Sequence, residues 1–358
     1  MKILIVKLSS LGDVVHAMPA VQDIRQAYPE AQIDWVVERG FAPLVQRCAG
    51  VHRVIACELR RWRKSPFSTP TRLAWQAFKA ELQHEQYDAV IDLQGLSKSA
   101  LVSWLAQLTP KGQRFGLANQ TEGSGFEAPA RWVADVAIAL QPHIHAVTRS
   151  RELCARALGY VLPEIQSFGL LAHVDKAPIA IENVANEAAC QHGVVALVHG
   201  TSRADKQWPL ANWLALGQRL NDCGYAVALP HGSDEEQRFA QEIASGLAHV
   251  QVWPRLGLDA LTDALAGCAG VIGVDSGLSH IAVALDLPHV QIYNFDTAWR
   301  TGPLVAQAVL IDGQRPALRQ RSVFARPTPS VDVVWQTWRA VSGSGAVSAA
   351  PSAVVATL

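Results

Sequence analysis

Residues 270–288 read GVIGVDSGLSHIAVALDLP, and the fold can be predicted by working outward from this stretch. It begins as a short apolar run, typical of a strand that is buried on both faces. Asp275, Ser276 and Gly277 end that run, and apolar residues then recur at helical spacing. A strand that leads directly into a helix is part of a βαβ unit, so the stretch predicts a parallel sheet.

The same alternation continues in both directions along the chain. In the second half, strands are expected at 194–200, 225–232, 250–254, 270–277 and 290–294, with helices at 210–222, 234–246, 258–268 and 278–286. In the first half, strands are expected at 2–7, 32–37, 52–57 and 87–94, and a first helix is expected from Asp13 to Tyr28. Each half therefore predicts a doubly wound α/β domain, with the boundary between residues 165 and 190.

We divide the chain into a first domain at 1–170 and a second at 171–330. The spacing of apolar residues at 331–342 predicts a terminal helix, which we expect to pack back on the first domain. Small residues dominate 343–358, which is typical of a disordered tail. Residues 109–130 show no periodicity and are expected to form a long loop of the functional or mobile kind.

Composition limits the classes of partner. The 358 residues are 49% hydrophobic, as expected of a globular protein, and 31 basic residues balance 31 acidic ones. The resulting zero net charge gives no overall field for a polyanion, so no nucleic-acid partner is expected. Residues 1–160 hold 19 basic and 14 acidic side chains and residues 161–358 hold 12 and 17, which gives net charges of +5 and −5. Domains of opposite charge suggest different ligands.

The cysteines and the N-terminus indicate a cytoplasmic protein. Six cysteines without any C-x-x-C pair are typical of reduced thiols rather than of disulfides or a zinc site. Only four apolar residues separate Lys2 from Lys7, too few for a signal peptide or a spanning helix. A peripheral membrane contact remains compatible with this pattern.

Several enzyme classes are excluded because their motifs are missing from the sequence. It contains no G-x-G-x-x-G or G-x-x-x-x-G-K-[ST] loop, so a dinucleotide dehydrogenase or a P-loop NTPase would lack its phosphate site. H-E-x-x-H, G-x-S-x-G and acidic metal clusters are missing as well, and no metal site is expected.

The chemistry is expected in the loops that follow strands, where open α/β sheets bind their ligands. The first of these loops, SSLGD (9–13), places Asp13 where a helix begins. The carboxylate of Asp13 has two interpretations: a cap for the free amides of the helix, or a general base in a cleft between the domains. Gly12 beside it lets another molecule approach the backbone.

Two loops of the second half carry groups suited to a nucleotide. HGTSRADKQWP (199–209) brings the hydroxyls of Thr201 and Ser202 and the cation of Lys206 together, a set that can bind a pyrophosphate or form an ordinary exposed loop. HGSDEEQ (231–237) places Glu235 and Glu236 at a helix start, where a carboxylate either stabilises the helix or accepts both hydroxyls of a ribose.

The loop after 270–274 predicts an anion site made from backbone. Free amides of Ser276, Gly277 and Leu278 at a helix N-terminus would point beyond the strand end. His280 lies one turn further on the same face as Ser276, and an ordinary structural histidine is the alternative for it.

A basic cluster stands out in the first half. Residues 60–64 read RRWRK, and Lys98 follows another expected strand. Such a run is normally a solvated face, but arginine forks also bind phosphate or carboxylate groups of an acidic acceptor.

In chain order, KLSSLGDVVHAMPA, RRWRK, IDLQGLSKSA, VHGTSRADKQWP and VDSGLSHIAVALD resemble the lipopolysaccharide heptosyltransferases of glycosyltransferase family 9, over residues 1–340. The resemblance implies the GT-B fold, in which two Rossmann-like domains face each other across a cleft. It implies an inverting, metal-independent transfer of heptose from ADP-L-glycero-β-D-manno-heptose to a Kdo residue of Kdo-lipid A. The protein would act at the cytoplasmic face of the inner membrane, without a cofactor and as a monomer.

The resemblance also implies a role for each motif. Asp13 matches the catalytic base, and Lys206, with Thr201 and Ser202, matches the group that binds the ADP pyrophosphate. Glu236 falls on the ribose position, with Glu235 one residue away as the alternative. The sugar and phosphate contacts of the donor would come from Asp275, Ser276, Gly277, Leu278 and His280, and the acceptor contacts from Arg60, Arg61, Arg63, Lys64 and Lys98.

One departure from the family concerns the loop after residue 114. Members usually carry an Arg-Glu-Pro element there, but this chain reads TEGSGFEAP at 121–129, so an acceptor-contacting arginine is missing. Arg114 and Arg131 are candidate replacements. Two alternatives to the whole interpretation stay open: a member of the family with a different acceptor, and a non-catalytic two-domain binder of sugars or nucleotides.

Overall fold

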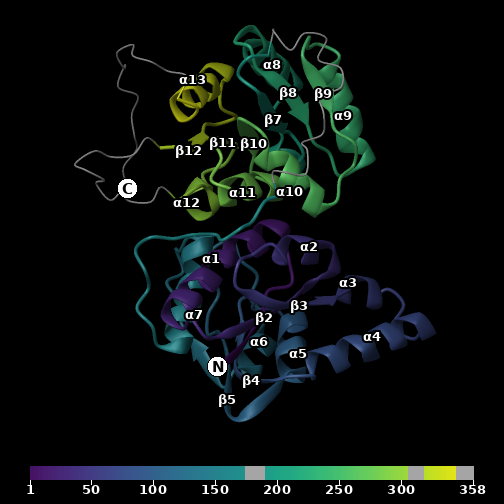
Figure 1. Ribbon diagram of the computed structural model, residues 1–358, viewed down its shortest axis with the longest axis vertical. Helices are drawn as coiled ribbons and strands as arrows, with labels where there is room; N and C mark the ends of the chain where they lie inside the picture. The colour runs from purple at the N-terminus through teal and green to yellow at the C-terminus, as the bar shows by residue number, and fades with distance from the viewer. Residues whose placement is uncertain (174–189, 305–317, 344–358) are drawn as a thin grey trace.

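Two parallel six-stranded sheets, one in each half of the chain, form the framework of the computed structural model (Figure 1). The structure describes residues 1–173, 190–304 and 318–343. The first sheet has the order β3-β2-β1-β4-β5-β6, and the second has the order β12-β11-β10-β7-β8-β9. The first contains β1 (Lys2–Val6), β2 (Gln32–Glu38), β3 (Val51–Cys57), β4 (Gln86–Asp92), β5 (Gln107–Leu117) and β6 (Val136–Ile138). The second contains β7 (Val194–Val198), β8 (Ala226–Leu229), β9 (Val250–Val252), β10 (Gly270–Val274), β11 (His289–Tyr293) and β12 (Gln320–Phe324).

Helices pack against both sheets, and the central strands are correspondingly apolar. Ile3, Leu4, Ile5 and Val6 of β1 have no exposed surface, because neighbouring strands and helices cover them on all sides. The first domain contains α1 (Leu11–Ala27), α2 (Ala42–Val45), α3 (Leu59–Trp62), α4 (Thr69–Leu82), α5 (Ser97–Leu105), α6 (Ala128–Val133) and α7 (Ala146–Leu158). The second contains α8 (Leu210–Asp222), α9 (Asp234–Ala244), α10 (Leu258–Ala266), α11 (Gly277–Ala284), α12 (Ala298–Thr301) and α13 (Val331–Val341). Short 3₁₀ turns lie at Arg39–Phe41 and Ala204–Lys206.

The expected fold class, two doubly wound domains, is confirmed, and the expected strands are all present with shifts at their ends. Three strands were not expected: β5, β6 and β12. The expectation of one long loop at 109–130 is wrong, because β5 reaches Leu117 and α6 begins at Ala128. The pairing of β5 with β4 shifts register between Tyr87 and Ala89, opposite the polar run at 109–112. That irregular pairing explains why the sequence there looks like a loop.

The terminal helix exists, but its expected position is wrong. The helix α13 packs against β11, β12 and α8 of the second domain, not against the first domain (Figure 1). Its Trp338 is fully buried, and a Cβ added to Gly270 would lie 2.6 Å from the Trp338 ring. The glycine therefore makes room for the indole. The tail expected at 343–358 lies outside the described residues from 344 onward.

The two domains meet through helices, chiefly α1 against α11 and α2 against α10 (Figure 1). Glycines allow the close approach of α1 and α11: a Cβ on Gly12 would lie 2.6 Å from His280, and a Cβ on Gly277 would lie 2.6 Å from Leu11. At the second contact Arg47 donates to both carboxylate oxygens of Asp263, at 2.5 and 2.8 Å. Among the described helices, none has both the length and the apolar character needed to cross a bilayer.

Candidate active site

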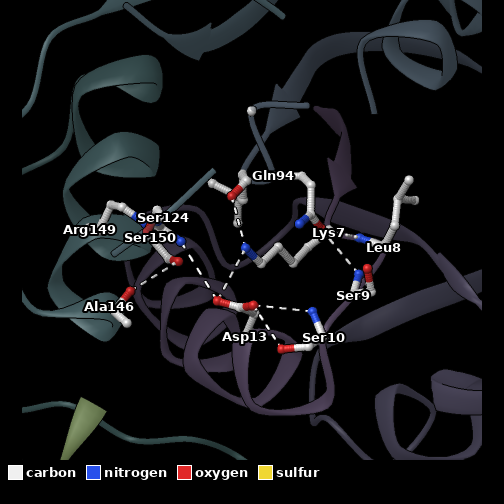
Figure 2. A network of polar contacts seen from close by, with 12 residues as sticks. Lys7, Leu8, Ser9, Ser10, Asp13, Gln94, Ser124, Ala146, Arg149 and Ser150 are labelled. Carbon is white, nitrogen blue, oxygen red and sulfur yellow. Dashed lines mark hydrogen bonds and ion pairs between the residues drawn. The ribbon is translucent and has the colours of Figure 1, made fainter. Parts of the chain in front are cut away.

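Asp13 lies in the first turn of α1, directly after the loop that follows β1, and its side chain is 36% exposed. One carboxylate oxygen accepts hydrogen bonds from the Ser10 amide at 3.1 Å and the Ser10 hydroxyl at 2.9 Å (Figure 2). The other oxygen faces two cations. Asp13 therefore caps its helix with one oxygen, as the first interpretation required, and keeps a second, differently placed oxygen for other contacts.

The two cations beside Asp13 come from separate elements. Lys7 Nζ lies 3.8 Å and an Arg149 nitrogen 3.9 Å from Asp13 Oδ1 (Figure 2). Burial alone would raise the pKa of the Asp13 carboxyl, but Lys7 and Arg149 outweigh it and hold that pKa well below its ordinary value. Burial also lowers the pKa of the Lys7 ammonium to about 8. Asp13 is therefore ionised at neutral pH in this structure.

Hydrogen bonds to neighbouring segments hold in place the loop that leads from β1 to Asp13. The Gln94 side-chain oxygen accepts from the amides of Leu8 and Ser9, both at 3.1 Å (Figure 2). Lys98 Nζ donates to the Ser9 hydroxyl at 2.8 Å, and Lys7 Nζ donates to the Leu93 carbonyl at 3.1 Å. These contacts tie the end of β1 to the end of β4, so Asp13 is held at the carboxyl edge of the sheet.

A second charged cluster lies at the carboxyl edge of the other sheet. Asp275 follows β10 and is 7% exposed; Lys206 Nζ contacts its Oδ2 at 2.5 Å, and His280 Nε2 lies 3.4 Å from its Oδ1. Burial would raise the pKa of Asp275, but His280 and Lys206 outweigh it and keep that pKa well below its ordinary value. Three residues that were singled out separately in the sequence thus form one unit.

The turn between β10 and α11 has the expected geometry. Ser276 is the N-cap residue of α11, Gly277 and Leu278 form its first turn, and all three residues are partly exposed. Within the described residues, the buried Ser276 hydroxyl has no hydrogen-bond partner. The amides of the first turn of α11, together with the Ser276 hydroxyl beside them, can therefore bind an anion.

Thr201, Ser202, Glu235 and Glu236 line a pocket of about 510 Å³ between the ends of β7 and β8. Glu236 accepts from the Gly232 amide at 2.6 Å, and a Cβ on Gly200 would lie 2.6 Å from its other oxygen. Both glutamates reach the pocket, but Glu236 is the one held between the two strand ends. The pocket size is typical of small-molecule sites.

The two clusters approach each other where α1 meets α11. The rings of His16 and His280 lie 4.2 Å apart, and Asp13 and Asp275 both act electrostatically on His16. Burial, His280 and His145 together hold the pKa of His16 well below its ordinary value, so a neutral imidazole separates the two carboxylates. His16 and its neighbour His145 were not singled out in the sequence.

The basic cluster lies on and after α3. Arg60, Arg61, Arg63 and Lys64 are exposed, and Lys98 on α5 is half-buried. Arg61 pairs with Glu58 at 3.1 Å. In the described part of the chain, no carboxylate forms an ion pair within 4.0 Å with the side chain of Arg60, Arg63, Lys64 or Lys98, although the Arg60 backbone amide donates to Glu38 at 3.4 Å. This surface therefore has cations available for an anionic ligand.

The structure also locates the arginines near the altered loop. The Arg114 guanidinium donates to carbonyls of Ser103, Trp104 and Ala106 at the end of α5. Arg131 is exposed on α6. Arg149, which sequence reasoning missed, contacts Thr121 and Ser124 of the loop as well as Asp13. Its only sequence signal is a basic residue in a helix, which is too common to be informative.

The described residues contain no group of three or more His, Cys, Asp or Glu side chains placed to hold a metal ion.

Comparisons with known proteins agree on one family. The sequence profile of glycosyltransferase family 9 (heptosyltransferase) matches residues 75–325. Lipopolysaccharide heptosyltransferase 1 of Escherichia coli K12 is 41% identical, over 82% of this chain and 88% of that protein. The protein of the same name from Salmonella typhimurium is 40% identical, with the same coverage. The solved structure of E. coli heptosyltransferase WaaC with ADP is 34% identical and has a TM-score of 0.77, over 94% of this chain and 98% of that one. This chain is a member of glycosyltransferase family 9, the heptosyltransferases.

Proposed function

We propose that this protein transfers L-glycero-D-manno-heptose from ADP-heptose to a Kdo residue of Kdo-lipid A, with inversion at the anomeric carbon. The relatives named lipopolysaccharide heptosyltransferase 1 and the WaaC structures with ADP and ADP-2-deoxy-2-fluoro heptose support the donor. The observation that carries the proposal is the meeting of Asp13 with the Lys206–Asp275–His280 cluster at the contact between α1 and α11. A base and a diphosphate site on opposite domains are what a transfer across the cleft requires.

On the donor side, the pocket beside Glu236 would hold the nucleoside. Glu236, rather than Glu235, would accept the ribose hydroxyls, because its carboxylate is already fixed between Gly200 and Gly232. Thr201 and Ser202 would bind the pyrophosphate, together with Lys206 and the amides of Ser276, Gly277 and Leu278. Asp275 would contact the heptose, with His280 fixing its orientation.

The reaction is a single displacement. The acceptor hydroxyl oxygen forms a bond to the anomeric carbon while the bond from that carbon to the β-phosphate oxygen breaks. The bonding electrons leave with ADP, whose added negative charge Lys206 and the α11 amides would stabilise. The hydroxyl proton passes to Asp13.

The cations around Asp13 bear on its strength as a base. A carboxylate whose pKa is strongly lowered is ionised but accepts a proton reluctantly. Kdo is an acidic sugar, and its carboxylate near the partly exposed Asp13 would offset part of the charge of the buried Lys7 and Arg149. We infer that acceptor binding raises the pKa of Asp13 toward its ordinary value and so activates it only in the ternary complex.

On the acceptor side, Arg60, Arg61, Arg63, Lys64 and Lys98 would bind further anionic groups of Kdo-lipid A. Arg149 would replace the arginine that the loop after residue 114 lacks, because it links that loop to Asp13. Because this acceptor is a lipid, we place the protein at the cytoplasmic face of the inner membrane. We propose that it acts there as a monomer.

The test is a transfer reaction analysed by mass spectrometry. The purified protein is incubated with ADP-heptose and, separately, with Kdo-lipid A, heptosyl-Kdo-lipid A and lipid A. We expect one added heptose on Kdo-lipid A and none on lipid A. Addition only to the heptosylated acceptor would show that the protein acts at a later step, and no product with any acceptor would contradict the proposal.

A further inference from the structure

A groove lies between α3, α4 and α5, and of the residues given a role in the proposed reaction it contains only the cations Arg63 and Lys98. It encloses about 500 Å³, within the range of small-molecule sites. Its walls are mainly apolar: Leu59, Trp62, Trp75 and Leu101 contribute to them. Polar ligands such as sugars or nucleotides would leave their hydrogen-bonding groups unsatisfied against such walls.

The floor of the groove is a rigid aromatic cluster. The ring centres of Trp62 and Trp75 lie 5.7 Å apart, and Phe78 lies 5.5 Å from Trp62 and 5.8 Å from Trp75. Trp62 and Phe78 are buried. Because these rings support one another, the groove is formed before any ligand arrives. Among the described residues, none provides an acceptor for the buried Trp62 N–H.

Cations surround the mouth of the groove. Arg63, Arg72 and Lys98 all contribute to its lining, and within the described chain the side-chain nitrogens of these three residues form no ion pair with a carboxylate within 4.0 Å. An apolar site with unpaired cations at its edge matches one kind of ligand: a hydrocarbon chain attached to an anionic head group.

The groove is connected to the candidate active site. Lys98 lines the groove and donates to the Ser9 hydroxyl, next to the residue that binds Asp13. A ligand with its head at Asp13 and its chain in the groove would therefore pass Lys98. Leu101 of the groove is 41% exposed, and large apolar side chains outside its lining are exposed on the same helices or next to them: Phe67, Leu73 and Trp104 are 91%, 62% and 62% exposed.

We propose that this groove binds one acyl chain of the lipid acceptor while the cations at its mouth bind the anionic head group. The identity of the acceptor in this inference rests on the proposed function. The binding of an anionic amphiphile to the groove does not.

The first experiment measures binding without transfer. Decyl phosphate, below its micelle concentration, is titrated into the protein by calorimetry, with inorganic phosphate and decyl glucoside as reference ligands. We expect decyl phosphate to bind at least tenfold more tightly than either, and Leu101→Glu to weaken that binding about tenfold because a carboxylate would enter the apolar site. Leu73→Glu is the matched control: it is on the exposed face of α4, does not line the groove, and should leave binding unchanged.

Equal binding of decyl phosphate to the wild type and to Leu101→Glu would overturn the proposal, provided that both proteins melt at similar temperatures. Should Leu101→Glu unfold, Leu101→Gln replaces it, with the same expected direction. If decyl phosphate binds as expected but no acceptor receives heptose, the groove stands and the proposed function fails.

The second experiment assigns the chain to the acceptor. Transfer is measured with Kdo-lipid A and with its fully deacylated form. We expect Leu101→Glu to raise the KM for the acylated acceptor about tenfold and to leave kcat/KM for the deacylated one within twofold. An equal loss of transfer with both acceptors would contradict a chain-binding groove. So would an equal loss in Leu101→Glu and Leu73→Glu on acceptor embedded in a bilayer, and that result would indicate docking on a flat membrane surface.

Discussion

Asp13 and Asp275 both lie at the carboxyl edge of a sheet, Asp13 beyond the central strand β1 and Asp275 directly after the central strand β10, yet their surroundings differ. Asp13 is 36% exposed and its cations stand 3.8 and 3.9 Å away, whereas Asp275 is 7% exposed and Lys206 contacts it at 2.5 Å. Both pKa values are lowered by neighbouring cations against the effect of burial. The difference lies in access: Asp13 is partly exposed to a substrate, while Asp275 is buried and Lys206 and His280 hold its two oxygens in place, so a heptose would meet a fixed carboxylate there.

This contrast separates two uses of a carboxylate. An accessible carboxylate whose neighbouring cations lie at a distance can receive a proton when the negative charge of a ligand offsets those cations. A buried carboxylate in direct contact with Lys206 and His280 instead fixes the position of these groups, and so holds a cation ready for a diphosphate. We therefore expect the rate of the chemical step to depend most on Asp13 and the stabilisation of the leaving group to depend on Lys206. The contact between the domains is expected to depend on the histidines between them.

The largest effect is expected from Asp13→Asn. The amide keeps the size of the side chain but cannot accept the proton, and general-base catalysis contributes about 10²–10⁴ in rate. We expect kcat for heptose transfer to fall by about that factor, while ADP binding, measured by calorimetry, stays within twofold.

The capping contact of Asp13 calls for a control. Ser10→Ala removes the hydroxyl that donates to Asp13 but leaves the carboxylate in place. It should cost about 1 kcal/mol of stability and little activity. If Asp13→Asn instead lowers the melting temperature as Ser10→Ala does and transfers heptose at nearly the wild-type rate, Asp13 is only a helix cap.

A smaller effect is expected from Lys206→Ala. Removing one preorganised group that stabilises developing charge costs about 2.7–4 kcal/mol in the barrier, or about 10²–10³-fold in kcat. Lys206→Arg retains the charge and should recover part of that loss. Steady-state transfer rates with saturating acceptor provide the measurement. Near wild-type turnover in Lys206→Ala would show that the ion pair with Asp275 is structural only.

The sequence was sufficient for the fold because apolar strands alternate with helices in both halves. It failed where that pattern is weak. The strand β5 contains Pro110 and Gly112 in an irregular pairing, and β12 is largely exposed, so neither shows a buried strand pattern. The position of α13 depends on Trp338 fitting against Gly270, a contact between residues far apart that no local pattern contains.

The same distinction applies to the site. Loops after strands are short and carry recognisable motifs, so Asp13, Lys206 and Asp275 were each found in the sequence. Their grouping was not, because Lys206 and Asp275 lie 69 positions apart and meet only through the order of β7 and β10. Arg149 and His16 lie within helices where nothing local marks them, and only the packing of α1 shows that they flank Asp13.

The smallest effect is expected from the histidines at the domain contact. His16 faces His280, His145, Asp13 and Asp275, and its pKa lies well below the ordinary value. Burial lowers the pKa of His145 to about 4, although its contact with the Gly302 carbonyl opposes this. A histidine that is neutral when folded takes up a proton more readily when unfolded, so stability falls as the pH drops below about 6.5. The lowered pKa values of Asp13 and Asp275 act only below about pH 4, so these two carboxylates do not alter the effect of the histidines between pH 7 and 5.

We expect His145→Gln to flatten the dependence of the melting temperature on pH across that range. One histidine contributes at most about 1.4 kcal/mol per pH unit, which corresponds to about 3 °C in a protein with domains of this size. The slope is the measured quantity, because Gln also alters the contact with Gly302 and so shifts stability at every pH. His84→Gln, at a side chain that is 73% exposed, is the matched control and should leave the slope unchanged. Equal slopes in the wild type and His145→Gln would mean that protonation of the domain contact does not limit stability. The contrast between the accessible Asp13 and the occupied Asp275 would then be tested by the Asp13 and Lys206 variants alone.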